Sequence, residues 1–190
     1  MSEAAFGKVR VHDDVYDVRT MVRLVAQQVD LSVRDPWTRA YAAEVLRGGQ
    51  ALALAGGPSE ADQIGKIFWH VKNNISYIQD PRGYEFIPTA KRGIQIGAED
   101  CDGHVVIVCS LLSTLGFATG ARVISPDGQN WHIYSVCMFD PMSRPSRYIA
   151  LDTTQRDSVP GWEPPPAMRR HQIDVTFSDG KAYQSNGRAL

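Results

Sequence analysis

Cys101 stands between two aspartates at the start of an apolar run, in the stretch GAEDCDGHVVIVCSLLSTLGF that covers residues 97–117. A cysteine can be a small buried apolar residue, a metal ligand or, as a thiolate, a nucleophile. The N–H groups at the start of a helix stabilise a thiolate, whereas the charges of Asp100 and Asp102 oppose it. The nucleophile interpretation therefore needs a histidine partner.

His132 and Asp152 supply that partner in the second half of the chain. Residues 131–140 and 147–154 have the alternating pattern of two strands joined as a hairpin. His132 begins the first strand and Asp152 ends the second, so both emerge at the same edge of the sheet. An aspartate oxygen there can accept the proton of one imidazole nitrogen and leave the other nitrogen for a thiol. The pattern predicts catalytic roles for Cys101, His132 and Asp152.

A metal site is the competing interpretation of the same stretch. Cys101 and His104 are three residues apart and can share a helix face, with Cys109 further along it. A closed zinc site requires four ligands, and no paired C-x-x-C or H-x-x-x-H motif supplies the others. We therefore predict no metal ligands here, and we expect Cys109 and Cys137 to be buried core residues.

The first half of the chain predicts three short, separately capped helices. They cover residues 17–32, 35–49 and 59–74, with Asp17, Asp35 and Ser59 at their starts. A fourth, buried helix begins near Cys101, with Asp100 as its N-cap, and ends at Gly116. One face of this helix contains residues spaced at helical intervals: Cys101, Val105, Val108, Leu112 and Leu115.

The remaining segments predict one long connection and an antiparallel sheet. Residues 75–97 contain repeated proline and glycine, which indicates an extended loop. Residues 118–125, 131–140 and 147–154 alternate like strands, and a further hairpin is expected around residues 178–180. The expected fold class is α+β, with N-terminal helices and a central helix packed on the antiparallel sheet. We divide the chain into an N-terminal helical segment (1–58), a catalytic core (59–162) and a C-terminal extension (163–190).

Composition narrows the functional classes. The 190 residues are 43% hydrophobic and carry a formal net charge of -1, so no overall basic field favours nucleic-acid binding. No apolar run reaches the length of a membrane helix, and the first residues lack the pattern of a signal peptide. Three widely spaced cysteines argue against a disulfide framework. We expect a cytoplasmic protein that contacts neither membrane nor nucleic acid.

The order of these motifs resembles the transglutaminase-like superfamily, whose members have a Cys-His-Asp triad on a papain-like core. The matching segments are GAEDCDGH, NWHIY and LDTT, within residues 59 to about 162. The segments D-P-x-G-x-E-x-I-P, D-C-D-x-H and P-G-W look most similar to transglutaminase-like proteins of Mu-like phages and prophages. The resemblance implies catalytic residues Cys101, His132 and Asp152.

Two features depart from the superfamily pattern, and a third concerns a cofactor. Ala98 and Glu99 lengthen the usual G-D-C motif, and the aromatic residue that supports the oxyanion in many members has three candidates here, namely Trp69, Tyr77 and Tyr84. In related periplasmic proteases of the LapG type, acidic residues flanking the cysteine bind calcium. The resemblance therefore implies calcium as a cofactor candidate at Asp100 and Asp102, although helix capping explains these aspartates equally well.

The expected function is cysteine-dependent acyl transfer on peptide or glutamine amide bonds through a thioester, mainly as a hydrolase. The phage resemblance implies a protein or peptide substrate, such as a phage structural protein or a cell-wall peptide, and a virion-associated location. The alternative is a catalytically silent virion or tail-associated structural protein on the same fold.

Overall fold

The computed structural model describes residues 8–12, 17–48, 59–81, 84–138, 148–184 and 187–190. Its centre is a five-stranded sheet in the order β7-β6-β5-β8-β9, in which every neighbouring pair is antiparallel. The strands are β5 (Ala118–Ser125), β6 (His132–Met138), β7 (Tyr148–Leu151), β8 (His171–Ser178) and β9 (Lys181–Gln184). The mixed α/β class with an antiparallel sheet, expected from the sequence, is confirmed.

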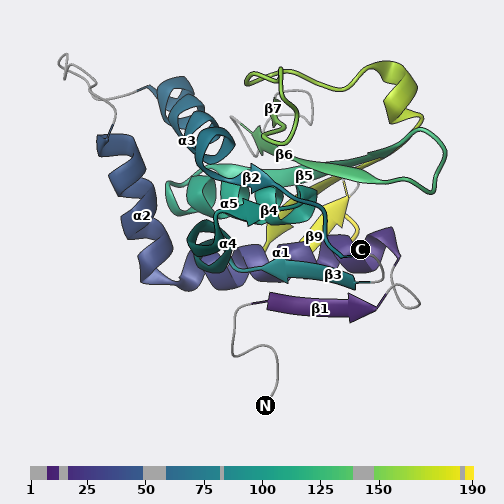
Figure 1. Ribbon diagram of the computed structural model, residues 1–190, viewed down its shortest axis with the longest axis horizontal. Helices are drawn as coiled ribbons and strands as arrows, with labels where there is room; N and C mark the ends of the chain where they lie inside the picture. The colour runs from purple at the N-terminus through teal and green to yellow at the C-terminus, as the bar shows by residue number, and fades with distance from the viewer. Residues whose placement is uncertain (1–7, 13–16, 49–58, 82–83, 139–147, 185–186) are drawn as a thin grey trace.

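Helix α5 (Cys101–Thr114) is the central element of the core (Figure 1). It packs against β6 on one side and against α1 on another, and its residues from 102 to 112 are all buried. A helix that is apolar on all sides is stable only when other elements surround it, which explains the uninterrupted apolar run. Cys109 and Cys137 are both fully buried, as predicted.

The three capped helices lie where the sequence predicts them. They are α1 (Val18–Arg34), α2 (Pro36–Arg47) and α3 (Glu60–Asn74). Asp17 and Asp35 accept hydrogen bonds from the first backbone N–H groups of α1 and α2, and Ser59 forms a reciprocal capping box with Asp62 at the start of α3. Because these caps are local, the sequence contained all the information needed to place these helix starts.

The prediction of an extended loop over residues 75–97 was wrong in part. This segment contains β2 (Ser76–Tyr77), β3 (Tyr84–Pro88) and α4 (Ala90–Ile96), and β4 (Ala98–Glu99) follows it. β3 pairs with β1 (Lys8–His12), a partner more than 70 residues away that no local pattern reveals. The glycines interpreted as loop residues have other roles: Gly97 ends α4 with φ of 74°.

The C-terminal segment, expected as an extension, contributes two strands to the central sheet. β8 lies directly beside β5, and the expected hairpin forms with a turn at Asp179 and Gly180 before β9. The approach of β8 to β5 is so close at Gly120 that a Cβ there would lie 2.0 Å from the carbonyl oxygen of Val175. Glycine is therefore required at this position of the central strand.

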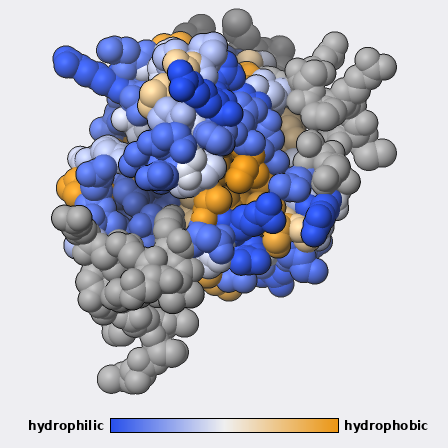
Figure 2. Space-filling model, turned by 90° about the vertical axis from the view of Figure 1, so that its right-hand side faces the viewer, coloured by the Kyte–Doolittle hydropathy of each residue, from blue (hydrophilic) through white to orange (hydrophobic). Residues whose placement is uncertain are grey.

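On the face shown in Figure 2, hydrophilic side chains surround a compact apolar area near the centre. No helix within the described ranges combines the length and the apolar composition that a bilayer crossing requires. The large apolar side chains with substantial exposure are Leu31, Trp69, Tyr77, Ile78, Ile96, Val159 and Met168.

Candidate active site

Cys101 is the first residue of α5, as the sequence predicts. Asp100 is the N-cap, and its Oδ1 accepts a hydrogen bond from the backbone N–H of Gly103 at 3.3 Å. The rigid, buried helix therefore fixes the backbone of Cys101, while its side chain is only partly covered. This arrangement explains why a reactive residue type adjoins a long apolar run.

His132 and Asp152 meet at one end of the sheet. His132 is the first residue of β6, and Asp152 directly follows β7, the neighbouring antiparallel strand. The Nε2 atom of His132 lies 2.8 Å from Oδ2 of Asp152. Because the carboxylate accepts the Nε2 proton, Nδ1 of His132 is the nitrogen left to act as a base.

Asp152 is held as a charged acceptor by further contacts. Its Oδ1 accepts hydrogen bonds from the backbone N–H and the hydroxyl of Thr154, at 3.0 and 2.7 Å. Burial alone would raise the pKa of Asp152, but the hydrogen bond and charge of His132, together with Thr154, outweigh it, so the pKa lies below its ordinary value. Asp152 thus stays ionised and fixes the imidazole orientation.

The Cys101 thiol and the His132 imidazole line one cavity of about 440 Å³. The sulfur also has a hydrogen bond with the backbone of Ile133, the residue after His132, which places the thiol against the start of β6. Burial raises the pKa of Cys101 well above its ordinary value, and the charges of Asp100 and Asp102 raise it further, while the Ile133 contact acts in the opposite direction. The helix start alone therefore does not provide a thiolate.

His104, considered as a metal ligand with Cys101, has a different set of contacts. Its Nδ1 lies 2.8 Å from the hydroxyl of Thr153, so it links α5 to the residue after Asp152. Burial lowers its pKa to about 4, more than the charges of Asp100 and Asp152 raise it. His104 is thus a neutral residue of the buried interior. Among the described residues, it forms no metal-binding group with Cys101 and Cys109.

A group of three carboxylates lies beside the start of α5, and we call Asp80, Glu85 and Asp100 the carboxylate cluster. One oxygen from each lies within 4.8 Å of the others. The backbone N–H of Phe86 donates to Oδ2 of Asp80, which links Asp80 to the strand that carries Glu85. The sequence suggested calcium at Asp100 and Asp102, but Asp102 is not part of this group.

Asp102 is a buried acid next to the carboxylate cluster. Its side chain is only 1% exposed. Burial raises its pKa well above the ordinary value, and the charge of Asp100, with smaller effects of Glu85 and Asp80, raises it further. The motif D-P-x-G-x-E already contained Asp80 and Glu85, but nothing in its spacing indicated that these residues approach Asp100.

Of the three aromatic candidates for oxyanion support, Tyr77 lies at the site. It lines the same cavity as Cys101 and His132, and the charge of Cys101 contributes to raising its pKa after the larger effect of burial. Trp69 instead borders a separate cavity between α2 and α3. The side chain of Tyr84 lies outside the described residues.

Sequence reasoning missed the segment that follows Asp152. Lys72 of α3 donates to the carbonyl of Gln155 and, at 2.7 Å, to the hydroxyl of Ser158. Ser158 in turn donates to the backbone carbonyl of Asp152 at 2.5 Å. The segment then passes along the cavity, where Trp162 and Met168 form part of the wall.

Comparisons with sequences of known proteins gave no match to a family model and none to a curated protein. Comparisons of structure gave several matches at low identity. Legionella pneumophila LapG is 16% identical with a TM-score of 0.53, and the match covers 85% of this chain and 87% of LapG. LapG treated with EGTA matches with a TM-score of 0.50 at 16% identity, over 87% and 86% of the two chains.

Two larger proteins also match. A proposed protease from Parabacteroides distasonis is 10% identical with a TM-score of 0.51, over 88% of this chain but 30% of that protein. A proposed cysteine protease from Cytophaga hutchinsonii matches at 12% identity with a TM-score of 0.47, over 65% of this chain and 39% of its own. The chain thus spans well under half of these two proteins. The similarity to LapG over 85% of this chain and 87% of LapG shows that the two proteins share a fold.

Proposed function

We propose that this protein is a cysteine-dependent acyl-transfer enzyme that acts on peptide or glutamine amide bonds, mainly as a hydrolase. The observation that carries the proposal is the 2.8 Å contact between His132 and Asp152, beside a cavity that Cys101 also lines. The fold shared with LapG supports it. Cys101 is the nucleophile, His132 the general base and acid, and Asp152 the residue that orients the imidazole.

In the first half-reaction, Nδ1 of His132 takes the thiol proton as the sulfur attacks the amide carbonyl carbon. A bond between sulfur and carbon forms, and the carbonyl electron pair moves to oxygen. The tetrahedral intermediate then collapses, the carbon–nitrogen bond breaks, and His132 donates its proton to the leaving amine. The product is a thioester on Cys101. A base is necessary because the raised pKa of Cys101 keeps the thiol protonated at neutral pH.

The oxyanion has two donors in reach of the same cavity. The backbone N–H of Cys101 is at the first position of α5, where helical N–H groups have no intrahelical acceptor. The hydroxyl of Tyr77, which lines the cavity, is the side-chain donor. In the second half-reaction, His132 takes a proton from water as the water oxygen attacks the thioester carbon. The sulfur–carbon bond then breaks with its electron pair on sulfur, His132 returns the proton to the sulfur, and the acid product leaves.

An amine in place of water would give cross-linking rather than hydrolysis. Transfer requires a site that admits an amine while excluding water, which is present at about 55 M. Polar side chains, including Asn130 and Gln155, line part of the cavity beside Cys101, so water has groups to hydrogen-bond with there. Hydrolysis is therefore the main reaction in this proposal. The similarity of the sequence motifs to Mu-like phage proteins suggests a phage structural protein or a cell-wall peptide as the substrate.

Iodoacetamide labelling tests the enzyme proposal without a known substrate. We expect Cys101 of the wild type to react at pH 7.5 at least about tenfold faster than in His132→Ala, with Asp152→Asn between them. His171→Ala removes an exposed histidine and serves as the control. Peptide mapping separates Cys101 from Cys109 and Cys137. Equal labelling of Cys101 in all variants would refute the enzyme and favour a structural protein that has lost the chemistry.

We further propose that the carboxylate cluster binds calcium. Calcium prefers oxygen ligands at about 2.3–2.6 Å, so oxygens around one ion lie within about 5 Å of each other. The oxygens of Asp80, Glu85 and Asp100 meet this condition. A bound ion would offset their negative charge and connect Asp80 and β3 to the N-cap of α5. Treatment of LapG with EGTA, a calcium chelator, supports testing this ion first.

Thermal unfolding tests the calcium proposal independently of activity. We expect 1 mM calcium chloride to raise the Tm by several degrees relative to EGTA, since a ligand at 100 times its Kd adds about 2.7 kcal/mol of stability. Glu85→Gln should lose most of this shift. Glu60→Gln, an exposed residue in the first turn of α3, is the matched control and should retain it. An identical Tm in calcium and EGTA would rule out the site.

A further inference from the structure

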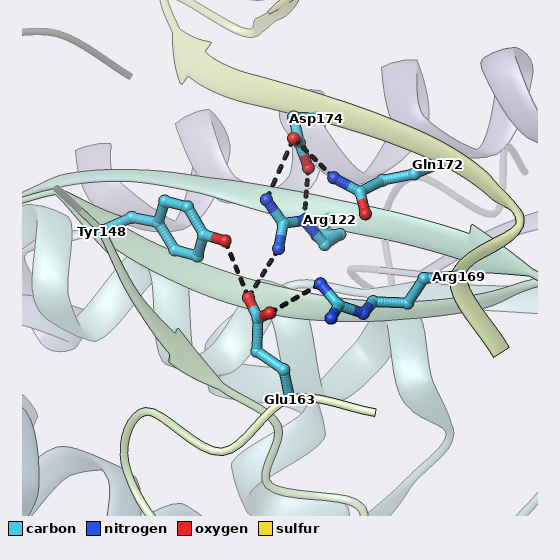
Figure 3. Close-up of polar contacts among 6 residues, drawn as sticks. All are labelled: Arg122, Tyr148, Glu163, Arg169, Gln172 and Asp174. Carbon is cyan, nitrogen blue, oxygen red and sulfur yellow. Dashed lines mark hydrogen bonds and ion pairs between the residues drawn. The ribbon is translucent and has the colours of Figure 1, made fainter. Parts of the chain in front are cut away.

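The segment of residues 161–169 has two opposite faces. Trp162, Pro164, Pro165 and Met168 line the cavity that contains Cys101 and His132. Glu163, between the first two, instead contacts the outer face of the sheet. Figure 3 shows Glu163 below the guanidinium group of Arg122, with Tyr148 and Arg169 on either side. The segment is therefore held from one side while it forms a cavity wall on the other.

The contacts of Glu163 are numerous and short. Its Oε1 accepts from Nη1 of Arg122 at 2.5 Å and from the hydroxyl of Tyr148 at 2.8 Å, and its Oε2 accepts from Nη1 of Arg169 at 2.7 Å. Asp174 of β8 fixes Arg122 in place through two hydrogen bonds at 2.6 and 3.0 Å. We call these four residues, Arg122, Glu163, Arg169 and Asp174, the arginine cluster.

Arg122 is a rigid anchor for this segment. It lies on the central strand β5, is 5% exposed, and its guanidinium lies 4.5 Å from the ring centroid of Tyr148. Since Arg169 directly follows Met168, the single carboxylate of Glu163 ties down both ends of the wall. The three consecutive prolines, 164–166, further restrict the backbone between them. A wall fixed in this way is preorganised for a ligand.

The chemistry of the wall indicates the ligand. Besides the four residues above, the buried Ile124 and the indole of Trp131 line the cavity. Among the residues that the structure describes, no aspartate, glutamate, lysine or arginine lines it. A charged side chain that entered would lose hydration and meet no opposite charge among the described lining residues, whereas an aromatic or large aliphatic side chain would bury apolar area against two tryptophans.

We propose that residues 162–168 form an apolar specificity subsite, which selects peptides with a bulky apolar side chain next to the acyl carbonyl, and that Glu163 is its positioning residue. This inference rests on the proposed function, because the subsite adjoins Cys101 and His132. A volume of about 440 Å³ admits one large side chain together with flanking backbone. In this arrangement Trp162 contacts the substrate side chain, whereas Glu163 does not contact the substrate and acts by holding residues 162–168 in place.

Alkylation of Cys101 by three N-acetylated chloromethyl ketones, derived from phenylalanine, lysine and glycine, tests the subsite. In each case the sulfur forms a bond to the methylene carbon, chloride leaves with the electron pair of the carbon–chlorine bond, and His132 takes the thiol proton. We expect the phenylalanine probe to react at least about tenfold faster than the glycine probe, and the lysine probe to gain no such advantage.

Variants separate substrate contact from positioning. Trp162→Ala should reduce the phenylalanine-to-glycine rate ratio about tenfold, and Trp162→Phe should restore most of it. Glu163→Gln should lower the ratio through weaker binding of the phenylalanine probe, with little change in its maximal rate. Asp30→Asn, which makes the same change in an exposed ion pair with Arg34 on α1, should keep the wild-type ratio.

The outcomes distinguish failure of the subsite from failure of the enzyme. A phenylalanine-to-glycine rate ratio near one in the wild type would overturn the subsite. If alkylation by the glycine probe still required His132 in that case, the enzyme proposal would remain intact. Alkylation that is independent of His132 would overturn both. A phenylalanine-to-glycine rate ratio in Trp162→Ala equal to that of the wild type would also refute the subsite. This test holds even if Glu163→Gln is too unstable to be measured.

Discussion

The carboxylate cluster and the arginine cluster differ in how their charges are balanced. In the arginine cluster, Glu163 and Asp174 alternate with two arginines, and every contact joins opposite charges (Figure 3). In the carboxylate cluster, three acidic side chains place oxygens within 4.8 Å of each other. Charges of one sign at this distance oppose each other, so folding has to overcome their repulsion.

The two clusters also occupy different places relative to the candidate active site. The carboxylate cluster includes Asp100, the residue before Cys101, and its charges act directly on the buried groups at the start of α5. The arginine cluster contacts neither Cys101 nor His132, and reaches the cavity only through residues next to Glu163. This difference agrees with a structural role for the arginine cluster and with the calcium site proposed for the carboxylate cluster.

The largest expected effect comes from removing the anchor of the balanced cluster. Arg122→Met would leave Glu163 and Asp174 without their shared cation in a partly buried site. We expect the free energy of unfolding, measured by urea denaturation, to fall by about 3 kcal/mol, because both carboxylates lose charge-assisted hydrogen bonds to a buried guanidinium and Glu163 keeps only Arg169 as a cationic partner.

A matched substitution at an exposed arginine controls for the change of side chain. Arg34→Met removes the i, i+4 ion pair with Asp30, in which the arginine side chain is 68% exposed. Exposed pairs of this kind contribute about 0.3–0.5 kcal/mol. If Arg122→Met lowered the free energy of unfolding by no more than Arg34→Met does, the arginine cluster would not be the structural anchor described above.

The sequence predicted the positions of Cys101, His132 and Asp152 better than it predicted either cluster. The start of α5 follows from a local cap and a continuous apolar run, and the hairpin of β6 and β7 follows from alternation and chain order. Each of these signals lies within about 20 residues. His132 and Asp152 could therefore be expected at one edge of the sheet from the order of residues alone.

The clusters depend on contacts that no local pattern encodes. Arg122 lies inside a predicted strand, and its partners Glu163 and Asp174 are 41 and 52 residues further along the chain. β3, which carries Glu85, is placed by pairing with β1 from the far N-terminal part. Since charged residues on a strand usually face solvent, neither burial nor pairing of these charges was predictable.

A second prediction concerns how the stability of the protein changes with pH, to which the buried His104 contributes. The pKa of His104 falls from its ordinary value of 6.5 to about 4 in the folded protein, because burial outweighs the charge of Asp100. The unfolded chain therefore binds more protons between pH 6.5 and 4, and stability falls as the pH drops through this window. The contribution of His104 to this loss is at most about 3 kcal/mol.

Urea denaturation of the wild type and His104→Gln at pH 7, 6, 5 and 4.5 measures this contribution. The loss of stability on acidification should be smaller in His104→Gln, which has no imidazole to protonate. His171→Gln, at an exposed position of β8, controls for loss of a histidine and should follow the wild type. Parallel curves for the wild type and His104→Gln would show that solvent reaches His104 and that it is not neutral by burial.

The smallest expected effect comes from making the same carboxylate-to-amide change in both clusters, in EGTA. Asp174→Asn removes the charge that faces Arg122, but its side chain is 43% exposed, so screening limits the loss of unfolding free energy to about 1 kcal/mol. Glu85→Gln removes one of the three carboxylates of the carboxylate cluster but keeps a side chain of the same shape, and should change stability in EGTA by no more than about 1 kcal/mol. Added calcium should then stabilise Asp174→Asn but not Glu85→Gln. If calcium stabilised both variants equally, Glu85 would not be a ligand of the ion, and the calcium site proposed for the carboxylate cluster would be wrong.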